Sequence, residues 1–116
     1  MRAVFLLRIV RWVILLRWCC VGTVFRCRCR AGADVYAPTL TGMGERAHLA
    51  GYLKPADINL DLHQQDVVQM LEYEDLREVV LVGHAYAGMV ITGVAELCPE
   101  RLKHLVYVNG VVPEDG

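Results

Sequence analysis

The run Glu78-Val79-Val80-Leu81-Val82-Gly83-His84-Ala85-Tyr86-Ala87-Gly88 decides the fold of this chain. Its first part, Glu78 to Val82, is an apolar, β-branched stretch too short for a helix and typical of a central parallel strand. The stretch leads directly into Gly83. Met89 to Cys98 then favours a helix, which Pro99 must interrupt or end. The sequence therefore predicts a strand, a tight turn and a helix in direct succession.

The residues before this run predict another strand and another helix. Asp34 to Pro38 has the composition of a short strand, and Thr39 to Pro55 is predicted to be a loop because it carries three glycines without helical periodicity. A helix is predicted over Leu62 to Tyr73, with Asp61 as its N-cap and Gln64 at the third helical position.

Leu105 to Val108 predicts one more buried strand after the second helix. The resulting order is strand, helix, strand, helix, strand. This order implies right-handed crossovers and a parallel sheet with helices on both faces. The fold class expected from the pattern is α/β.

The turn at Gly83 to Ala87 differs from the pattern G-x-S-x-G in two positions. That pattern places a serine on a strained strand-to-helix turn, where its hydroxyl stands exposed above the sheet. Here Ala85 occupies the serine position, and the whole chain contains no serine. Because a methyl group cannot attack a carbonyl or carry an acyl group, nucleophilic catalysis of the usual kind is excluded at this position.

Several separated stretches resemble the α/β-hydrolase family, in the branch that includes small esterases, plant methylesterases and hydroxynitrile lyases. They are Asp34 to Arg46, His48 to Ala50, Val80 to His84, Gly88 to Val90 and Leu105 to Val108. The resemblance covers about Ala31 to Gly116. It implies a partial α/β-hydrolase fold with a mostly parallel sheet flanked by helices, and a small ester or amide as the substrate of intact relatives.

The chain departs from the family in three ways. Ala85 replaces the nucleophilic serine, and Ala87 replaces the last glycine of the motif. No His-Gly loop, which in the family supplies one oxyanion-hole amide, is recognisable between Met1 and Arg30. The sequence stops at Gly116, before the segment that carries the family's acid and base.

The resemblance implies that Gly83, His84, Ala87 and Gly88 form the turn around the vacant position. Of the family's catalytic groups, it carries over only the backbone N–H of Tyr86, as an oxyanion donor. We therefore expect a catalytically inactive hydrolase-type protein. The alternatives are a binding module for a small apolar ligand or a partner protein, and a truncated gene product.

The remaining polar candidates favour ordinary structural roles. His84 is expected to be packed and hydrogen-bonded, since the residue before the serine position points away from the cleft. His48 and His63 are expected to play surface polar roles, and His104 to face solvent. Asp115 is expected to belong to a turn.

The cysteine spacings predict neither a disulfide framework nor a metal site. Cys27 and Cys29 are separated by one residue instead of the two of a zinc or redox pair, and no second pair completes four ligands. Cys19 and Cys20 are adjacent, and Cys98 is expected to be a buried small hydrophobic residue. We expect no cofactor and no nucleic-acid partner.

The first thirty residues differ sharply in composition from the rest. Residues 1–30 contain seven arginines and no acidic residue, for a net charge of +7, whereas residues 31–116 carry a net charge of −8. Four of the five cysteines and both tryptophans also lie before residue 31. The sequence therefore divides into an atypical apolar, arginine-rich segment (1–30) and a partial hydrolase domain (31–116).

A membrane role for residues 1–30 is not the favoured interpretation. Arg8, Arg11 and Arg17 interrupt the apolar stretch, and each costs roughly 2.5 to 3.5 kcal/mol at the centre of a membrane helix. A signal peptide, an organellar presequence and an interfacial helix each fit only in part. A further interpretation is that residues 1–30 are an out-of-frame translation of a GC-rich gene.

We expect a cytoplasmic protein that self-associates through an exposed apolar sheet edge at Leu105 to Val108.

Overall fold

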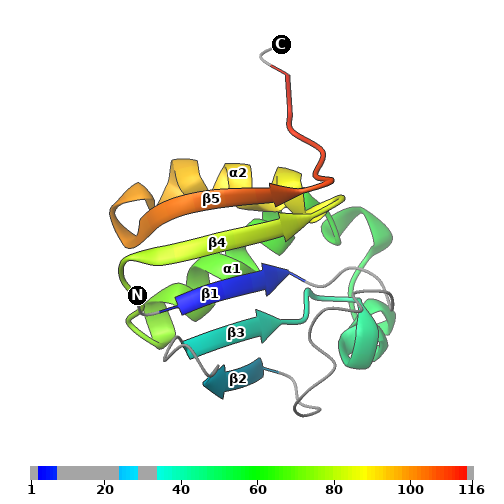
Figure 1. Ribbon diagram of the computed structural model, residues 1–116. Coiled ribbons are helices and arrows are strands. Elements are labelled where there is room, and N and C mark those ends of the chain that lie inside the picture. The colour runs from blue at the N-terminus through cyan, green and yellow to red at the C-terminus, as the bar shows by residue number, and fades with distance from the viewer. Residues whose placement is uncertain (1–2, 8–23, 29–33, 115–116) are drawn as a thin grey trace.

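In the described part of the chain, five strands form one sheet and two α-helices pack against it (Figure 1). The computed structural model describes residues 3–7, 24–28 and 34–114. The strands are β1 (Ala3–Leu7), β2 (Val24–Arg28), β3 (Asp34–Pro38), β4 (Val79–His84) and β5 (Leu102–Val108). Their order is β2-β3-β1-β4-β5, and all neighbouring pairs are parallel except β2 with β3.

The three strands predicted from the sequence are present, and the α/β class is confirmed. β3 has the predicted bounds. β4 continues two residues beyond the predicted end, because it pairs with β1 as far as Gly83 and with β5 as far as His84. β5 begins at Leu102, three residues before its predicted start.

Two strands come from the compositionally atypical first thirty residues. β1 lies between β3 and β4, with Phe5 in register with Tyr36 on one side and Leu81 on the other. β2 pairs antiparallel with the outer edge of β3. The division into residues 1–30 and 31–116 stays a prediction, and both parts contribute strands to the same sheet.

Helix α1 (Leu60–Tyr73) begins two residues earlier than predicted, and the prediction of Asp61 as its N-cap is wrong. Asn59 is the N-cap: its extended backbone precedes the helix, and its side-chain oxygen accepts a 3.0 Å hydrogen bond from the Leu62 N–H. The earlier start places the half-buried Leu60 against the core. The cap satisfies one of the N–H groups that the first helical turn leaves without an intrahelical partner.

Replacing the cap is expected to destabilise the protein more than replacing the neighbouring carboxylate. Asn59→Ala removes the hydrogen bond to Leu62 and should lower the free energy of unfolding by about 1 kcal/mol. Asp61→Ala, the matched control, removes only a charge in the first turn and should cost about 0.3–1 kcal/mol. Urea unfolding of both variants measures the difference. A larger loss in the Asp61 variant would contradict this assignment of the cap.

The segment predicted as a loop over Thr39 to Pro55 contains a 3₁₀ helix, η2 (Gly44–Gly51), and a second short one, η3 (Pro55–Asp57), begins at its end. The loop prediction is therefore wrong over these stretches. The reason lies in polar contacts: the Arg46 side chain donates to the Thr39 carbonyl at 2.8 Å, and the Thr39 hydroxyl donates to Glu45 at 2.6 Å. No apolar periodicity is needed to form a turn held in this way.

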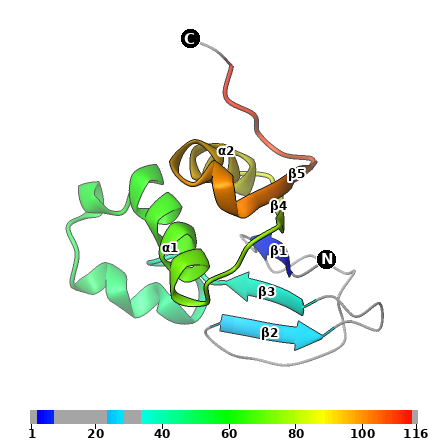
Figure 2. The same ribbon diagram turned by 90° about the vertical axis from the view of Figure 1, so that its left-hand side faces the viewer.

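Helix α2 (Ala87–Leu97) ends before Pro99, as predicted, and starts two residues before Met89. It packs against α1, where a Cβ added at Gly93 would overlap the Gln64 side chain. Figures 1 and 2 show both helices on the same face of the sheet. For the described part of the chain, the prediction of helices on both faces is therefore wrong.

The core lies between this face of the sheet and the two helices. Its largest fully buried side chains come from the segment after β3, from α1, β4 and α2, and are Leu40, Val67, Leu71, Val79, Leu81, Val90, Ile91 and Val94. Cys98 is 3% exposed, carries a free thiol and is buried as predicted.

β5 is not the buried strand that the sequence predicts. Val106 is 40% exposed and Val108 is 47% exposed, and His104 is exposed on the same face. The physical reason is position: β5 is the last strand of the described sheet, and the two described helices cover only the opposite face.

None of the helices in the described ranges is long and apolar enough to cross a membrane. The predictions that concern Arg8, Arg11, Arg17 and Asp115 lie outside the described residues. The same is true of Cys19, Cys20 and Cys29.

Candidate functional site

The candidate site is the turn between β4 and α2. β4 ends at His84 and α2 begins at Ala87, so Ala85 and Tyr86 connect them. Ala85 has a φ of +53°, in the left-handed region that side chains disfavour by about 1–2 kcal/mol. Its carbonyl accepts two 3.0 Å hydrogen bonds, from the N–H groups of Gly88 and Val111. Backbone contacts from α2 and from the segment after β5 therefore hold this strained residue.

Two glycines allow these segments to approach one another. A Cβ at Gly83 would lie 2.7 Å from the Ala87 carbonyl oxygen and 2.9 Å from Cδ1 of Ile91. A Cβ at Gly88 would overlap the backbone of Val111. Neither position leaves room for a side chain, so glycine is required for the close contact of strand, helix and following segment.

The turn presents a methyl group at its centre. Ala85 and Tyr86 are half-buried, and Ala87 and Gly88 are buried in the first turn of α2. No described group accepts a hydrogen bond from the Tyr86 N–H. Within the described ranges, a backbone donor that has no acceptor thus stands next to a residue that has no reactive atom.

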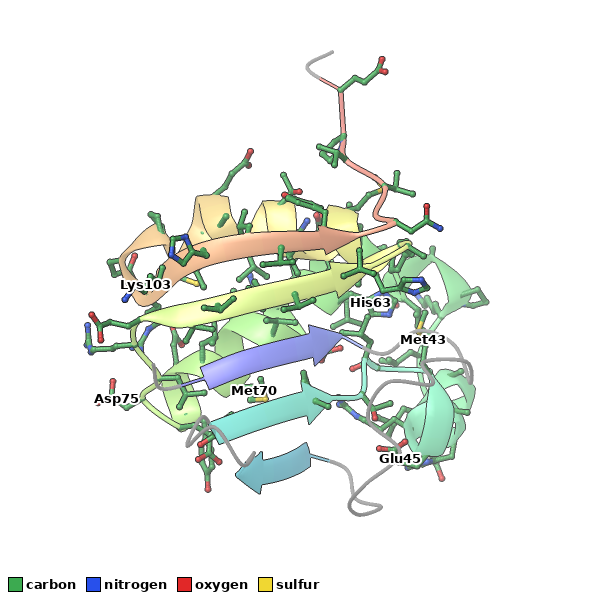
Figure 3. All side chains as sticks on the ribbon, viewed as in Figure 1. Met43, Glu45, His63, Met70, Asp75 and Lys103 are labelled. Atoms are coloured by element: carbon green, nitrogen blue, oxygen red, sulfur yellow. The ribbon has the colours of Figure 1, made fainter. Side chains whose placement is uncertain are left out.

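His63, expected on the surface, is 3% exposed, and that prediction is wrong. Its Nδ1 lies 3.0 Å from the Tyr86 phenol oxygen, and its Nε2 lies 3.0 Å from the Thr41 carbonyl oxygen. The rings of His63 and Tyr86 meet edge to face, with centroids 5.8 Å apart. Figure 3 shows His63 at the end of the sheet where the parallel strands finish.

Burial affects the Tyr86 phenol directly. It raises the pKa of the phenol by disfavouring the charged phenolate, so the hydroxyl keeps its proton at neutral pH. The Tyr86 side chain is therefore a neutral hydrogen-bonding group that is tied to α1 through His63.

Thr41 is itself fixed by a carboxylate of α1. Its N–H donates to Oδ2 of Asp66 at 2.7 Å, and its hydroxyl donates to Oδ1 at 2.8 Å. Arg46 lies 3.7 Å from the same carboxylate. The loop after β3, the helix α1 and the turn at Ala85 are thus joined by continuous polar contacts.

The other polar candidates do not join this cluster. His84 is half-buried at the end of β4, and strand alternation directs it away from the helix-covered face to which Gly83 belongs. His48 is exposed on η2, with its Nδ1 3.1 Å from the Glu45 carbonyl oxygen. Within the described chain, no hydrogen bond links either histidine or His104 to Ala85 or Tyr86.

The cluster of Thr41, His63 and Asp66 was not predicted from the sequence. A signal for His63 exists, because it lies three residues after Leu60 and four before Val67, on the apolar stripe of α1. No such signal marks Thr41 or Asp66. Among the described residues there is no group of three potential metal ligands.

Comparisons with known proteins agree with this architecture. The sequence profile described as "Alpha/beta hydrolase family" matches residues 16–116. The chain is 46% identical over 99 residues to the "Carbendazim hydrolyzing esterase" of Nocardioides sp. (strain SG-4G), which covers 85% of this chain and 39% of that protein.

A solved structure is similar as well. It is an extracellular α/β-hydrolase from a Paenibacillus species, described as sharing structural and functional homology with tobacco salicylic acid binding protein 2. The match has a TM-score of 0.64 and 29% identity, and it covers 75% of this chain and 33% of that one. The chain thus spans about two fifths or less of the length of these relatives. With this fold and these matches, the chain belongs to the α/β-hydrolase family.

Proposed function

We propose that residues 83–88 form the catalytic turn of an esterase-type hydrolase, with Ala85 in the nucleophile position. We further propose that the chain, with alanine at this position, does not hydrolyse esters. The observation that carries the proposal is the left-handed Ala85 at the junction of β4 and α2, in a chain without serine. A glycine would adopt this backbone conformation without strain, so a strained alanine is consistent with an inherited or disabled motif.

The proposed chemistry follows from what the position lacks. In a serine-bearing relative the hydroxyl attacks the substrate carbonyl, a histidine takes and returns the proton, and two backbone amides stabilise the oxyanion. The Tyr86 N–H is the amide of this chain that would serve as one donor. With a methyl group at residue 85, no acyl-enzyme can form.

The substrate class is proposed by analogy. One relative is an esterase that hydrolyses carbendazim, as its name states. We infer a small ester or amide as the molecule that an intact version of this site accepts, without a cofactor. A cytoplasmic location stays a prediction.

The test is ester turnover by the chain and by its Ala85→Ser variant, with para-nitrophenyl acetate as substrate. The chain itself should hydrolyse this ester about 10⁶-fold more slowly than a serine-bearing member of the family. Turnover by the unaltered chain at a rate typical of a serine esterase would contradict the proposal.

The alternative of a non-catalytic binding module makes a different prediction for the same protein. Such a module would bind a small apolar ester or a partner protein at equilibrium, whereas a disabled hydrolase fragment should bind it weakly or not at all. Isothermal titration of the unaltered chain with a non-hydrolysable ester analogue distinguishes the two.

Self-association through β5 is also expected. Val106 and Val108 are exposed on the last described strand, and Val111 and Val112 are 50% and 54% exposed in the segment that follows. Apolar edge strands pair with other chains unless charge prevents it. We expect concentration-dependent association in sedimentation velocity, weakened roughly tenfold or more by Val106→Lys together with Val108→Lys.

Leu97→Lys is the matched control for this experiment. Leu97 is 52% exposed and belongs to α2 instead of β5, so its replacement should leave the association unchanged. A monomer at all concentrations in the unaltered chain would contradict the prediction.

A further inference from the structure

Both ring nitrogens of His63 have a hydrogen-bond partner, although we expect this residue at the surface from the sequence. One faces the Tyr86 phenol and the other faces the Thr41 carbonyl, each at 3.0 Å. The ring is buried, so water does not replace either contact. Each contact therefore constrains the imidazole.

The partners fix the tautomer. A carbonyl oxygen only accepts hydrogen bonds, so Nε2 must carry the proton that it donates to Thr41. In the neutral ring Nδ1 is then an acceptor, and the Tyr86 hydroxyl must be the donor. The direction of the chain of bonds is thus from Tyr86 to His63 and from His63 to Thr41.

The acceptor at the end of this chain is rigidly held. Thr41 donates two hydrogen bonds to the Asp66 carboxylate, which belongs to α1, the same helix that carries His63. The imidazole is therefore fixed both by its own helix and by the loop after β3. Tyr86 alone of these residues belongs to the turn between β4 and α2.

We propose that His63 is a positioning residue of this site, which orients Tyr86 and, through it, the backbone of residues 85 and 86. Tyr86 directly follows the nucleophile position, and its N–H donates to no group among the residues that the structure describes. The significance of this role rests on the proposed function, in which that N–H is an oxyanion donor. The hydrogen-bonded phenol restrains the residue at its side chain, while the bonds to the Ala85 carbonyl restrain it at the backbone.

The two amides that donate to the Ala85 carbonyl report on this restraint. We would measure the hydrogen exchange of the Gly88 and Val111 amides by NMR in the chain with Ala85 retained. The Cys98 amide, which donates to Val94 at the far end of α2, is the internal control. Tyr86→Phe removes only the phenol hydroxyl and keeps the ring.

Tyr86→Phe and His63→Leu should each accelerate exchange at Gly88 and Val111 by about tenfold, the factor that corresponds to loss of one net hydrogen bond. Exchange at Cys98 should not change. His63→Gln should stay close to the unaltered chain, because the glutamine carbonyl can accept from Tyr86 while its amide donates to Thr41.

Unchanged exchange at Gly88 and Val111 in Tyr86→Phe would overturn the proposal, as would equal acceleration at Cys98. If His63→Gln behaves like His63→Leu, the assigned hydrogen bonds are wrong. Tyr86→Phe keeps the test decisive if the leucine variant fails to fold. None of these measurements uses ester turnover, so ester turnover by the unaltered chain would count against the proposed function and not against the role of His63.

Discussion

Ester hydrolysis by this chain is expected to fall about 10⁶-fold below that of a serine-bearing member of the family, because removal of the nucleophile of a catalytic triad has an effect of this size. Such an effect exceeds what any other single side chain in the structure is expected to produce. It arises from the absent hydroxyl of Ala85, and the precise orientation of the turn cannot compensate for it.

Three versions of this chain and one reference enzyme, measured side by side, define the experiment. The unaltered chain and the Ala85→Ser variant are assayed with para-nitrophenyl acetate, and Ala95→Ser serves as the matched control. Ala95 lies half-buried on α2, so this control introduces the same hydroxyl in the helix that follows the turn, ten residues after Ala85. A serine esterase of the family supplies the reference rate.

The possible outcomes distinguish the lack of a nucleophile at residue 85 from the lack of other groups that hydrolysis requires. Turnover in Ala85→Ser but not in Ala95→Ser would support residue 85 as the nucleophile position. An inert Ala85→Ser would agree with inactivity of the chain and would show that a serine alone is not sufficient, as the non-additive behaviour of catalytic triads predicts. Turnover by the unaltered chain at the reference rate would refute inactivity.

The strands and helices with dense apolar signals could be predicted from the sequence. β3 and β4 are short apolar or β-branched runs bounded by glycine or proline, and their positions were predicted within two residues. The end of α2 was predicted because Pro99 lacks the N–H that a continuing helix needs. These signals are local, so they do not depend on tertiary contacts.

The features that were missed depend on tertiary contacts. β1 and β2 lie in an arginine-rich segment, and they are strands because the neighbouring strands supply their hydrogen-bond partners. The 3₁₀ helix η2 follows a turn that is held by the hydrogen bond from the Arg46 side chain to the Thr39 carbonyl. Strand pairing and long side-chain contacts of this kind have no periodic signature in a single sequence.

At the candidate site the sequence predicted the position of the turn but not its support. Gly83 and Ala85 could be located because the strand pattern leads directly into a glycine-flanked motif. The burial of His63 depends on Tyr86 and Thr41, which lie more than twenty positions away. A histidine near the start of a helix is commonly exposed, so the position of His63 in the sequence favoured the surface, whereas its side chain is buried.

The second large effect is expected at Leu81, which is fully buried in β4, four residues before Ala85. It belongs to the core between the sheet and the two helices, on the same face of β4 as Gly83. Leu81→Ala removes buried methyl and methylene groups and leaves a cavity that the surrounding side chains fill only in part. The free energy of unfolding should fall by about 2–5 kcal/mol.

Urea unfolding measures this loss, and Leu97→Ala is its matched control. Leu97 is 52% exposed, so the same truncation there removes little buried surface and should cost about 0.5 kcal/mol or less. Because small domains are stable by only about 5–15 kcal/mol, the loss at Leu81 would remove a large share of the total. Equal losses in the two variants would mean that β4 does not pack against the helices as the structure shows. The strand that carries the turn would then lack the support on which the geometry at Ala85 depends.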